Sequence, residues 1–202
     1  MDTEKIEWFL RGNWAPLSEE KELNDLKVDG SIPTELDGIY VRTGPNPKDG
    51  KGSHWFLGDG MVHGIRLKKG KAEWYRNRFV QTPDITEPLT DPMAGLGDLR
   101  RGKGNTHVVA HNEQIMCLEE AHWPWTINAD LETTGVLNYE GKLDCSMTAH
   151  PKVCPVTGEL LAFSYFSFEQ PYLKYIRVSA DGKLQQVEGI ELPEMVMMHD
   201  FN

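Results

Sequence analysis

Two histidines have the residue type and the spacing to bind one metal ion together. His150 lies in the segment Met147-Thr148-Ala149-His150-Pro151-Lys152, and His199 follows the apolar run 195–198, which we expect to be a buried strand or its approach. They are 49 residues apart, close to the repeat of about 40–50 residues that separates successive four-stranded sheets of a propeller. Equivalent positions on successive sheets point at a common axis, so the two imidazoles are predicted to converge. Imidazole ligands suit iron, zinc, copper or nickel rather than calcium or magnesium.

Two neutral imidazoles are too few for a tight site, so a competent centre needs further ligands. The other histidines give no comparable signal, because a lone histidine at a strand end or turn is usually a hydrogen-bonded structural residue. We predict that role for His54, His63, His107, His111 and His122.

A second metal chemistry is possible in the same region. Cys145, His150 and Cys154 lie within ten residues, and thiolates with imidazole are typical zinc ligands. The spacing contains no C-x-x-C pair, and a structural zinc site normally has four ligands. This zinc knuckle is therefore the weaker of the two metal hypotheses.

Composition restricts the partners. The chain has 202 residues, with 31 acidic and 21 basic side chains and a net charge of −10, which disfavours binding to nucleic acid. No segment approaches the roughly 18 consecutive apolar residues of a spanning helix. An odd number of cysteines without an export signal indicates free thiols in a reducing compartment. We therefore expect a cytoplasmic protein.

Most of the chain reads as short strands, which indicates an all-β fold. Residues before about Leu26 show no sustained periodicity and are predicted to form an arm, and 81–103 is predicted to be a long irregular excursion. Three short polar turns, at 68–71, 111–114 and 180–183, predict hairpins between antiparallel neighbours. A propeller, a sandwich and a barrel all remain open on this pattern. The predicted strands are 38–42, 61–67, 72–80, 106–110, 115–118, 160–168, 172–178 and 187–192.

Several motifs then occur in one order along the chain. They are Gly12-Asn13-Trp14-Ala15-Pro16, Gly30-Ser31-Ile32-Pro33, the run 36–47 (LDGIYVRTGPNP), the run 55–64 (WFLGDGMVHG), Asn105-Thr106-His107, Thr148-Ala149-His150-Pro151-Lys152 and Met198-His199-Asp200-Phe201. Together they resemble the carotenoid cleavage oxygenase family from about Gly12 onward.

The resemblance implies a seven-bladed β-propeller whose axis holds Fe²⁺ through four histidines, under a cap of helices and loops. His150 matches the first iron ligand and His199 the second, while His63 and His107 fall in motifs that are not ligand motifs. Glu120, in Leu118-Glu119-Glu120-Ala121, matches the first carboxylate that orients a liganding imidazole. Residues 1–202 would then be the N-terminal part of one propeller domain, about its first three blades, truncated before the third and fourth ligand motifs.

The same resemblance implies a dioxygenase that splits a C=C bond of a carotenoid or apocarotenoid with O₂ into two carbonyls, with possible peripheral membrane contact. Stilbene-cleaving relatives usually carry a lysine just before the orienting glutamate, where this chain has Glu119, so an apolar polyene is favoured over a phenolic stilbene. Two alternatives stay open: a stilbene-cleaving relative, and a catalytically incomplete fragment that binds an apolar ligand or a partner. Nothing in the sequence indicates an oligomeric state.

Overall fold

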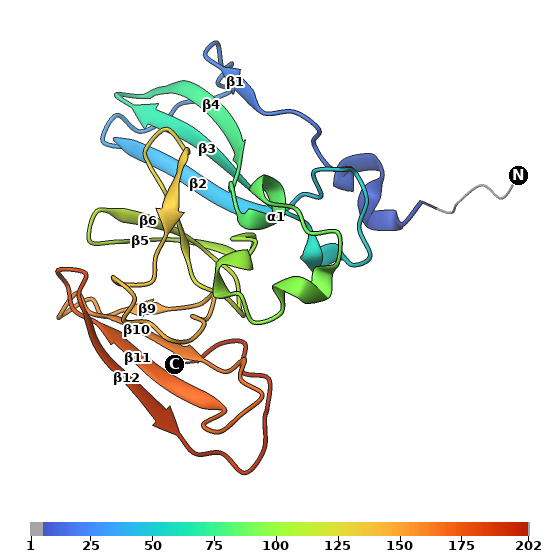
Figure 1. Ribbon diagram of the computed structural model, residues 1–202. Helices are drawn as coiled ribbons and strands as arrows, with labels where there is room; N and C mark the ends of the chain where they lie inside the picture. The colour runs from blue at the N-terminus through green and yellow to red at the C-terminus, as the bar shows by residue number, and fades with distance from the viewer. Residues whose placement is uncertain (1–5, 202) are drawn as a thin grey trace, which may run out of the picture.

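The computed structural model describes residues 6–201 and contains three four-stranded antiparallel sheets in succession along the chain (Figure 1). The first sheet has the order β1 (Lys21–Leu23), β4 (Lys71–Phe79), β3 (Gly60–Lys68), β2 (Gly38–Pro45). The second has the order β5 (His107–His111), β6 (Gln114–Leu118), β7 (Trp125–Ile127), β8 (Thr133–Val136). The third has the order β9 (Lys152–Val153), β10 (Leu160–Ser164), β11 (Leu173–Val178), β12 (Leu184–Ile190). The all-β prediction is confirmed, and successive four-stranded sheets are the arrangement of propeller blades.

The three predicted hairpins form, and their turn residues explain why. Lys69 and Gly70 have φ of 48° and 75°, and Asn112 and Glu113 have φ of 45° and 60°. Paired left-handed residues match the right-handed twist of the strands they join. The turns connect β3 to β4, β5 to β6 and β11 to β12, and all three pairs are antiparallel.

The N-terminal arm contains more regular structure than the sequence predicts. After two short 3-10 helices, η1 (Trp8–Leu10) and η2 (Gly12–Trp14), the arm forms β1 as the outer strand of the first sheet. The backbone N–H of Lys21 donates to Asn77 Oδ1 at 2.7 Å, and Asn77 is fully buried. The predictions also missed the short strands β7, β8 and β9, and extended β10 to 168 although it ends at Ser164.

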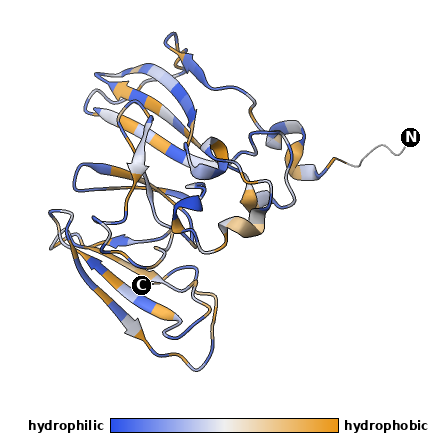
Figure 2. Ribbon diagram, in the orientation of Figure 1, coloured by the Kyte–Doolittle hydropathy of each residue, from blue (hydrophilic) through white to orange (hydrophobic). Residues whose placement is uncertain are grey.

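Two apolar clusters lie between neighbouring sheets, and β6 belongs to both. Met116 and Leu118 pack with residues of β10 and β11, whereas Cys117 packs with Val62 of β3 and Ile127 of β7. Successive side chains of a strand point to opposite faces, so β6 is buried on both sides. Figure 2 shows the matching alternation of hydrophobic and hydrophilic residues along the strands.

The predicted excursion at 81–103 is built from short helical turns rather than strands. They are α1 (Pro83–Thr86), η4 (Pro92–Gly95) and η5 (Leu99–Arg101), and η3 (Trp55–Leu57) lies between β2 and β3. No helix within 6–201 has the length and apolar content needed to cross a bilayer.

Candidate metal centre

Glu120, His150 and His199 come together although 79 residues separate the first from the last. One ligand atom from each lies within 4.8 Å of the others, and no other trio of His, Cys, Asp or Glu in residues 6–201 achieves this. The Nε2 atoms of the two histidines are 3.2 Å apart. Glu120 directly follows β6 of the second sheet, His150 precedes β9 and His199 follows β12 of the third.

His150 is positioned by a buried segment. Thr148 and Ala149, just before it, are fully buried. The N–H of Thr148 donates to the carbonyl of Phe163 at 2.8 Å, which ties the segment to β10. The ring nitrogen Nδ1 of His107 lies 2.8 Å from the carbonyl oxygen of Ala149, so His107 supports the backbone beside His150.

His199 is positioned by its neighbours rather than by a strand. Asp200 forms an ion pair with Lys152 at 2.6 Å, and the ring of Phe201 packs edge-on against Phe163 with centroids 4.8 Å apart. These contacts hold the last described residues against the third sheet (Figure 1). The expectation that 195–198 is a buried strand is wrong: the segment has no strand, and residues 195–197 are exposed. The His199 side chain is 57% exposed, against 26% for His150.

The carboxylate of Glu120 faces two hydroxyl groups with one oxygen and the imidazoles with the other. Oε2 accepts hydrogen bonds from the Tyr165 hydroxyl at 3.0 Å and the Thr148 hydroxyl at 3.3 Å. Oε1 lies 3.0 Å from His199 Nδ1 and 3.8 Å from His150 Nε2. Oε1 is nevertheless buried and accepts no well-aligned hydrogen bond from the described residues.

The local electrostatics favour a neutral ring at His150. Burial lowers the pKa of His150, Glu120 opposes that shift, and His199 adds to it. A neutral imidazole has a free lone pair, which is the form that binds a metal. Burial, reinforced by the Glu120 carboxylate, raises the pKa of Tyr165, so its hydroxyl keeps the proton that it donates.

The geometry fits a metal ion. Imidazole nitrogens bind transition metals at about 2.1 Å, as in zinc sites, and two nitrogens 3.2 Å apart can both reach one ion at that length. A buried carboxylate oxygen without an aligned donor has an unmet need for positive charge or an N–H. A cation between the imidazoles would supply that charge beside Glu120, and a proton on His199 Nδ1 would supply the donor.

The zinc hypothesis is wrong, because Cys145 and Cys154 do not join His150 in any ligand group within 6–201. Cys117, Cys145 and Cys154 are free thiols, as predicted.

The remaining histidines have protein partners, in agreement with their predicted structural role. These are the Phe56 N–H for His54, the Tyr75 hydroxyl for His63, the Ala149 carbonyl for His107, the Gly158 carbonyl for His111 and the Glu119 carboxylate for His122.

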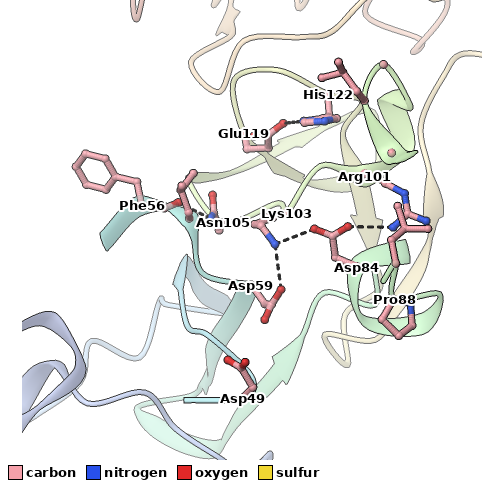
Figure 3. A pocket seen from close by; sticks show the side chains of 15 residues that line it. Asp49, Phe56, Asp59, Asp84, Pro88, Arg101, Lys103, Asn105, Glu119 and His122 are labelled. Atoms are coloured by element: carbon pink, nitrogen blue, oxygen red, sulfur yellow. Dashed lines mark hydrogen bonds and ion pairs between the residues drawn. The ribbon is translucent and has the colours of Figure 1, made fainter. Parts of the chain in front are cut away.

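A cavity of about 710 Å³ is lined by residues outside the three-residue cluster, among them Glu119, the chain neighbour of Glu120 (Figure 3). Glu119 and His122 line it, and their side chains are hydrogen-bonded to each other. At the other side Lys103 Nζ contacts Asp59 at 3.2 Å and Asp84 at 2.8 Å. Burial opposes the charge on Lys103, but the two carboxylates raise the pKa of Lys103 above its ordinary value.

The wall of this cavity was not predicted from the sequence. Its ionic residues come from five separate segments, at 49, 59, 84, 101–103 and 119–122, and no spacing rule connects them. Apolar side chains of Phe56, Leu57, Leu89 and Leu96 complete the lining.

Known proteins resemble the chain over nearly its whole length. Residues 14–202 match the family described as RPE65, retinal pigment epithelial membrane protein. The chain is 39% identical to carotenoid 9,10(9',10')-cleavage dioxygenase 1 of Arabidopsis thaliana, with 96% of the chain aligned to 42% of that protein. It is 40% identical to the carotenoid cleavage oxygenase of Mycobacterium tuberculosis, with 96% of the chain aligned to 40% of that protein. The chain thus spans about two fifths of the length of these relatives.

Solved structures share the fold. The lignostilbene dioxygenase of Pseudomonas brassicacearum aligns with a TM-score of 0.82 at 32% identity, covering 96% of this chain and 44% of its own. A cobalt-substituted Synechocystis ACO aligns with a TM-score of 0.75 at 23% identity, covering 92% of this chain and 45% of its own. On the family match and the identity to curated relatives, this chain belongs to the RPE65 family of carotenoid cleavage oxygenases.

Proposed function

We propose that the chain is the N-terminal part of a non-haem Fe²⁺ dioxygenase that cleaves a C=C bond of a carotenoid or apocarotenoid. The reaction adds the two atoms of O₂ to the two alkene carbons and gives two carbonyl products. The observation that carries the proposal is the convergence of His150 and His199, with Nε2 atoms 3.2 Å apart, beside Glu120. The relatives named as carotenoid cleavage enzymes support the reaction class.

The proposed architecture is a seven-bladed propeller to which residues 1–202 contribute about three blades of a single domain. The third and fourth histidine ligands would then come from sequence after residue 202. Closure by further sheets would protect the open edge of the third sheet, and edge strands are a known liability of β proteins.

In this proposal each residue has a defined task. His150 and His199 would hold the iron through their imidazole nitrogens, and Glu120 would accept a hydrogen bond from the Nδ1–H of His199, which fixes the ring tautomer and raises its basicity. Bound iron supplies the redox chemistry that reactions of O₂ require. The chain itself orients the imidazoles, buries Tyr165 and Thr148 behind the Glu120 carboxylate and favours a neutral ring at His150.

The proposed substrate is an apolar polyene. The cavity that Glu119 and His122 line has four large apolar side chains, from Phe56, Leu57, Leu89 and Leu96. Stilbene-cleaving relatives usually carry a lysine at the position of Glu119. In this chain the Glu119 carboxylate is hydrogen-bonded to His122. A hydroxylated stilbene is the second candidate, because the lignostilbene dioxygenase superposes with a TM-score of 0.82.

We also propose peripheral contact with a membrane near this cavity, because an apolar polyene dissolves in lipid rather than in water. Phe56, Leu57 and Leu96 line the cavity and are 60–71% exposed, which would place an apolar surface at its mouth.

The test is iron content and polyene cleavage in the complete protein, expressed with any sequence that follows residue 202 in its reading frame. We expect His150→Ala to lose both, and the matched control His54→Ala, at an exposed histidine outside the cluster, to keep both. Glu120→Gln is expected to reduce iron affinity about 10- to 100-fold, the usual effect of removing an orienting partner. Retention of iron and cleavage by His150→Ala would overturn the proposal. Iron binding without cleavage of any polyene or stilbene would favour the catalytically incomplete alternative.

A further inference from the structure

Two hydroxyl groups hold the Glu120 carboxylate from a different sheet. Tyr165 directly follows β10 and Thr148 precedes β9, so both belong to the third sheet, whereas Glu120 follows β6 of the second. Their bonds to Glu120 Oε2, at 3.0 Å and 3.3 Å, therefore bridge the two sheets at the metal cluster.

Neither hydroxyl is free to turn toward water. Tyr165 is 3% exposed and Thr148 is fully buried. The Tyr165 ring packs between Phe163 and Phe166, with centroids 5.7 Å and 5.4 Å away. Buried hydroxyls that lose their partner are costly, so both donors stay directed at Glu120.

Thr148 also contacts the backbone of the first histidine. Its hydroxyl oxygen accepts the N–H of His150 at 3.3 Å while its proton is donated to Glu120. One side chain thus fixes the spacing between the carboxylate and His150.

We infer that Tyr165 and Thr148 are positioning residues for the metal site. By occupying Oε2 they hold the carboxylate so that Oε1 faces His199 Nδ1, 3.0 Å away. That arrangement favours a proton on Nδ1, which would satisfy the buried Oε1, and leaves Nε2 of His199 available as a ligand. The inference rests on the proposed function, because it assigns a role in preparing a metal ligand.

Without the two donors the carboxylate has no partner that distinguishes its oxygens. The terminal torsion of a glutamate is broad, so Glu120 would rotate away from His199 and both neutral tautomers of that ring would be populated. A ring protonated on Nε2 cannot bind a metal through that atom.

The first measurement is the tautomer of His199 in the metal-free chain, read from long-range proton–nitrogen NMR correlations of the imidazole rings. We expect the Nδ1–H form to predominate in the parent chain. Tyr165→Phe should lower the ratio of Nδ1–H to Nε2–H at least threefold. Tyr139→Phe is the matched control, because Tyr139 is another buried tyrosine and is not one of the donors to Glu120.

The second measurement is a Co²⁺ titration of the complete parent protein and the same variants, each expressed with any sequence that follows residue 202 in its reading frame, and it is followed by the NMR signals of the histidine rings. Tyr165 contacts Glu120 rather than a liganding histidine, so Tyr165→Phe should weaken Co²⁺ binding by only about 3- to 10-fold. This is at or below the low end of the effect of removing a direct partner of a liganding side chain. Thr148→Val should act in the same direction, whereas Thr148→Ser keeps the hydroxyl and should restore parent behaviour.

The outcomes separate the two proposals. No Co²⁺ binding at His150 and His199 of the complete parent protein would refute the proposed metal site. Normal binding by the parent, with an unchanged tautomer ratio and affinity in Tyr165→Phe, would refute the positioning role alone. If Tyr165→Phe does not fold, the comparison of Thr148→Val with Thr148→Ser decides, and equal behaviour of those two would overturn the inference.

Discussion

Replacing Gly60 by alanine should destabilise the fold through one steric contact. A Cβ atom at this position would lie 2.1 Å from the carbonyl oxygen of Lys103 and 3.0 Å from that of Gly104. Both are backbone atoms, so no side-chain rotation can relieve the overlap. Ordinary van der Waals contact begins at 3.4 Å, which means that the 103–104 backbone must move by more than 1 Å.

This movement of the backbone would also disturb the ion pairs of Lys103 in the cavity wall. Lys103 holds Asp59 and Asp84 with its ammonium group at 3.2 Å and 2.8 Å, and a shift of its backbone breaks this alignment. Overpacking typically costs about 1–3 kcal/mol, and loss of part of the ion-pair network adds about 1 kcal/mol at this intermediate exposure. We expect Gly60→Ala to lose about 3 kcal/mol of unfolding free energy.

Urea unfolding followed by tryptophan fluorescence measures this loss. Gly44 is the matched control, because it lies in the neighbouring strand β2 and an added Cβ there meets nothing within 4 Å. Gly44→Ala should be neutral or gain up to about 1 kcal/mol, since alanine loses less conformational entropy than glycine in a strand. Equal unfolding free energies for the two variants would refute the steric argument.

Two other predictions concern pH and lipid. Burial, with a smaller contribution from Arg42, lowers the pKa of His63 to about 4. The folded state therefore has its full stability above the unfolded pKa of about 6.5, where the ring is neutral, and loses stability as the pH falls toward 4. Between pH 7 and pH 5 the parent should lose about 1 kcal/mol more unfolding free energy than His63→Gln, a value reduced for solvent screening of the partly exposed ring. Parallel pH profiles in urea titrations would contradict this. Substituting the exposed Phe56 and Leu96 by serine should reduce flotation of the protein with phosphatidylcholine vesicles. The control Val156→Ser, at an exposed valine outside the cavity lining, should float like the parent. Equal flotation of the parent, the double variant and the control would argue against membrane contact at this surface.

The sequence predicted the parts of the fold that local chemistry determines. The alternating runs of β3 and β4 and the turn at Lys69-Gly70 specify a hairpin without help from the rest of the chain, and the structure contains it. The spacing of His150 and His199 predicted their convergence, which the coordinates show at 3.2 Å. Family motifs added Glu120, whose carboxylate lies beside both rings.

Features that depend on contacts between distant segments could not be predicted. Strand β9 has only two residues and exists because it pairs with β10. The run 195–198 is apolar, yet residues 195–197 are exposed, because hydrophobicity alone does not say what covers a segment. The role of Tyr165 depends on a bond to a residue 45 positions earlier, which no local periodicity reports.

The cluster of Glu120, His150 and His199 takes its side chains from the ends of two sheets, so an ion bound there would couple to the docking of those sheets. In a chain whose second and third sheets have not yet docked, the two imidazoles of the third sheet lack the Glu120 carboxylate that orients His199, so such a chain has a lower affinity for the ion. Mass action then favours docked molecules in proportion to the free ion concentration. Under the proposed function, a higher concentration of free iron would therefore raise the fraction of chains in which the two sheets are docked.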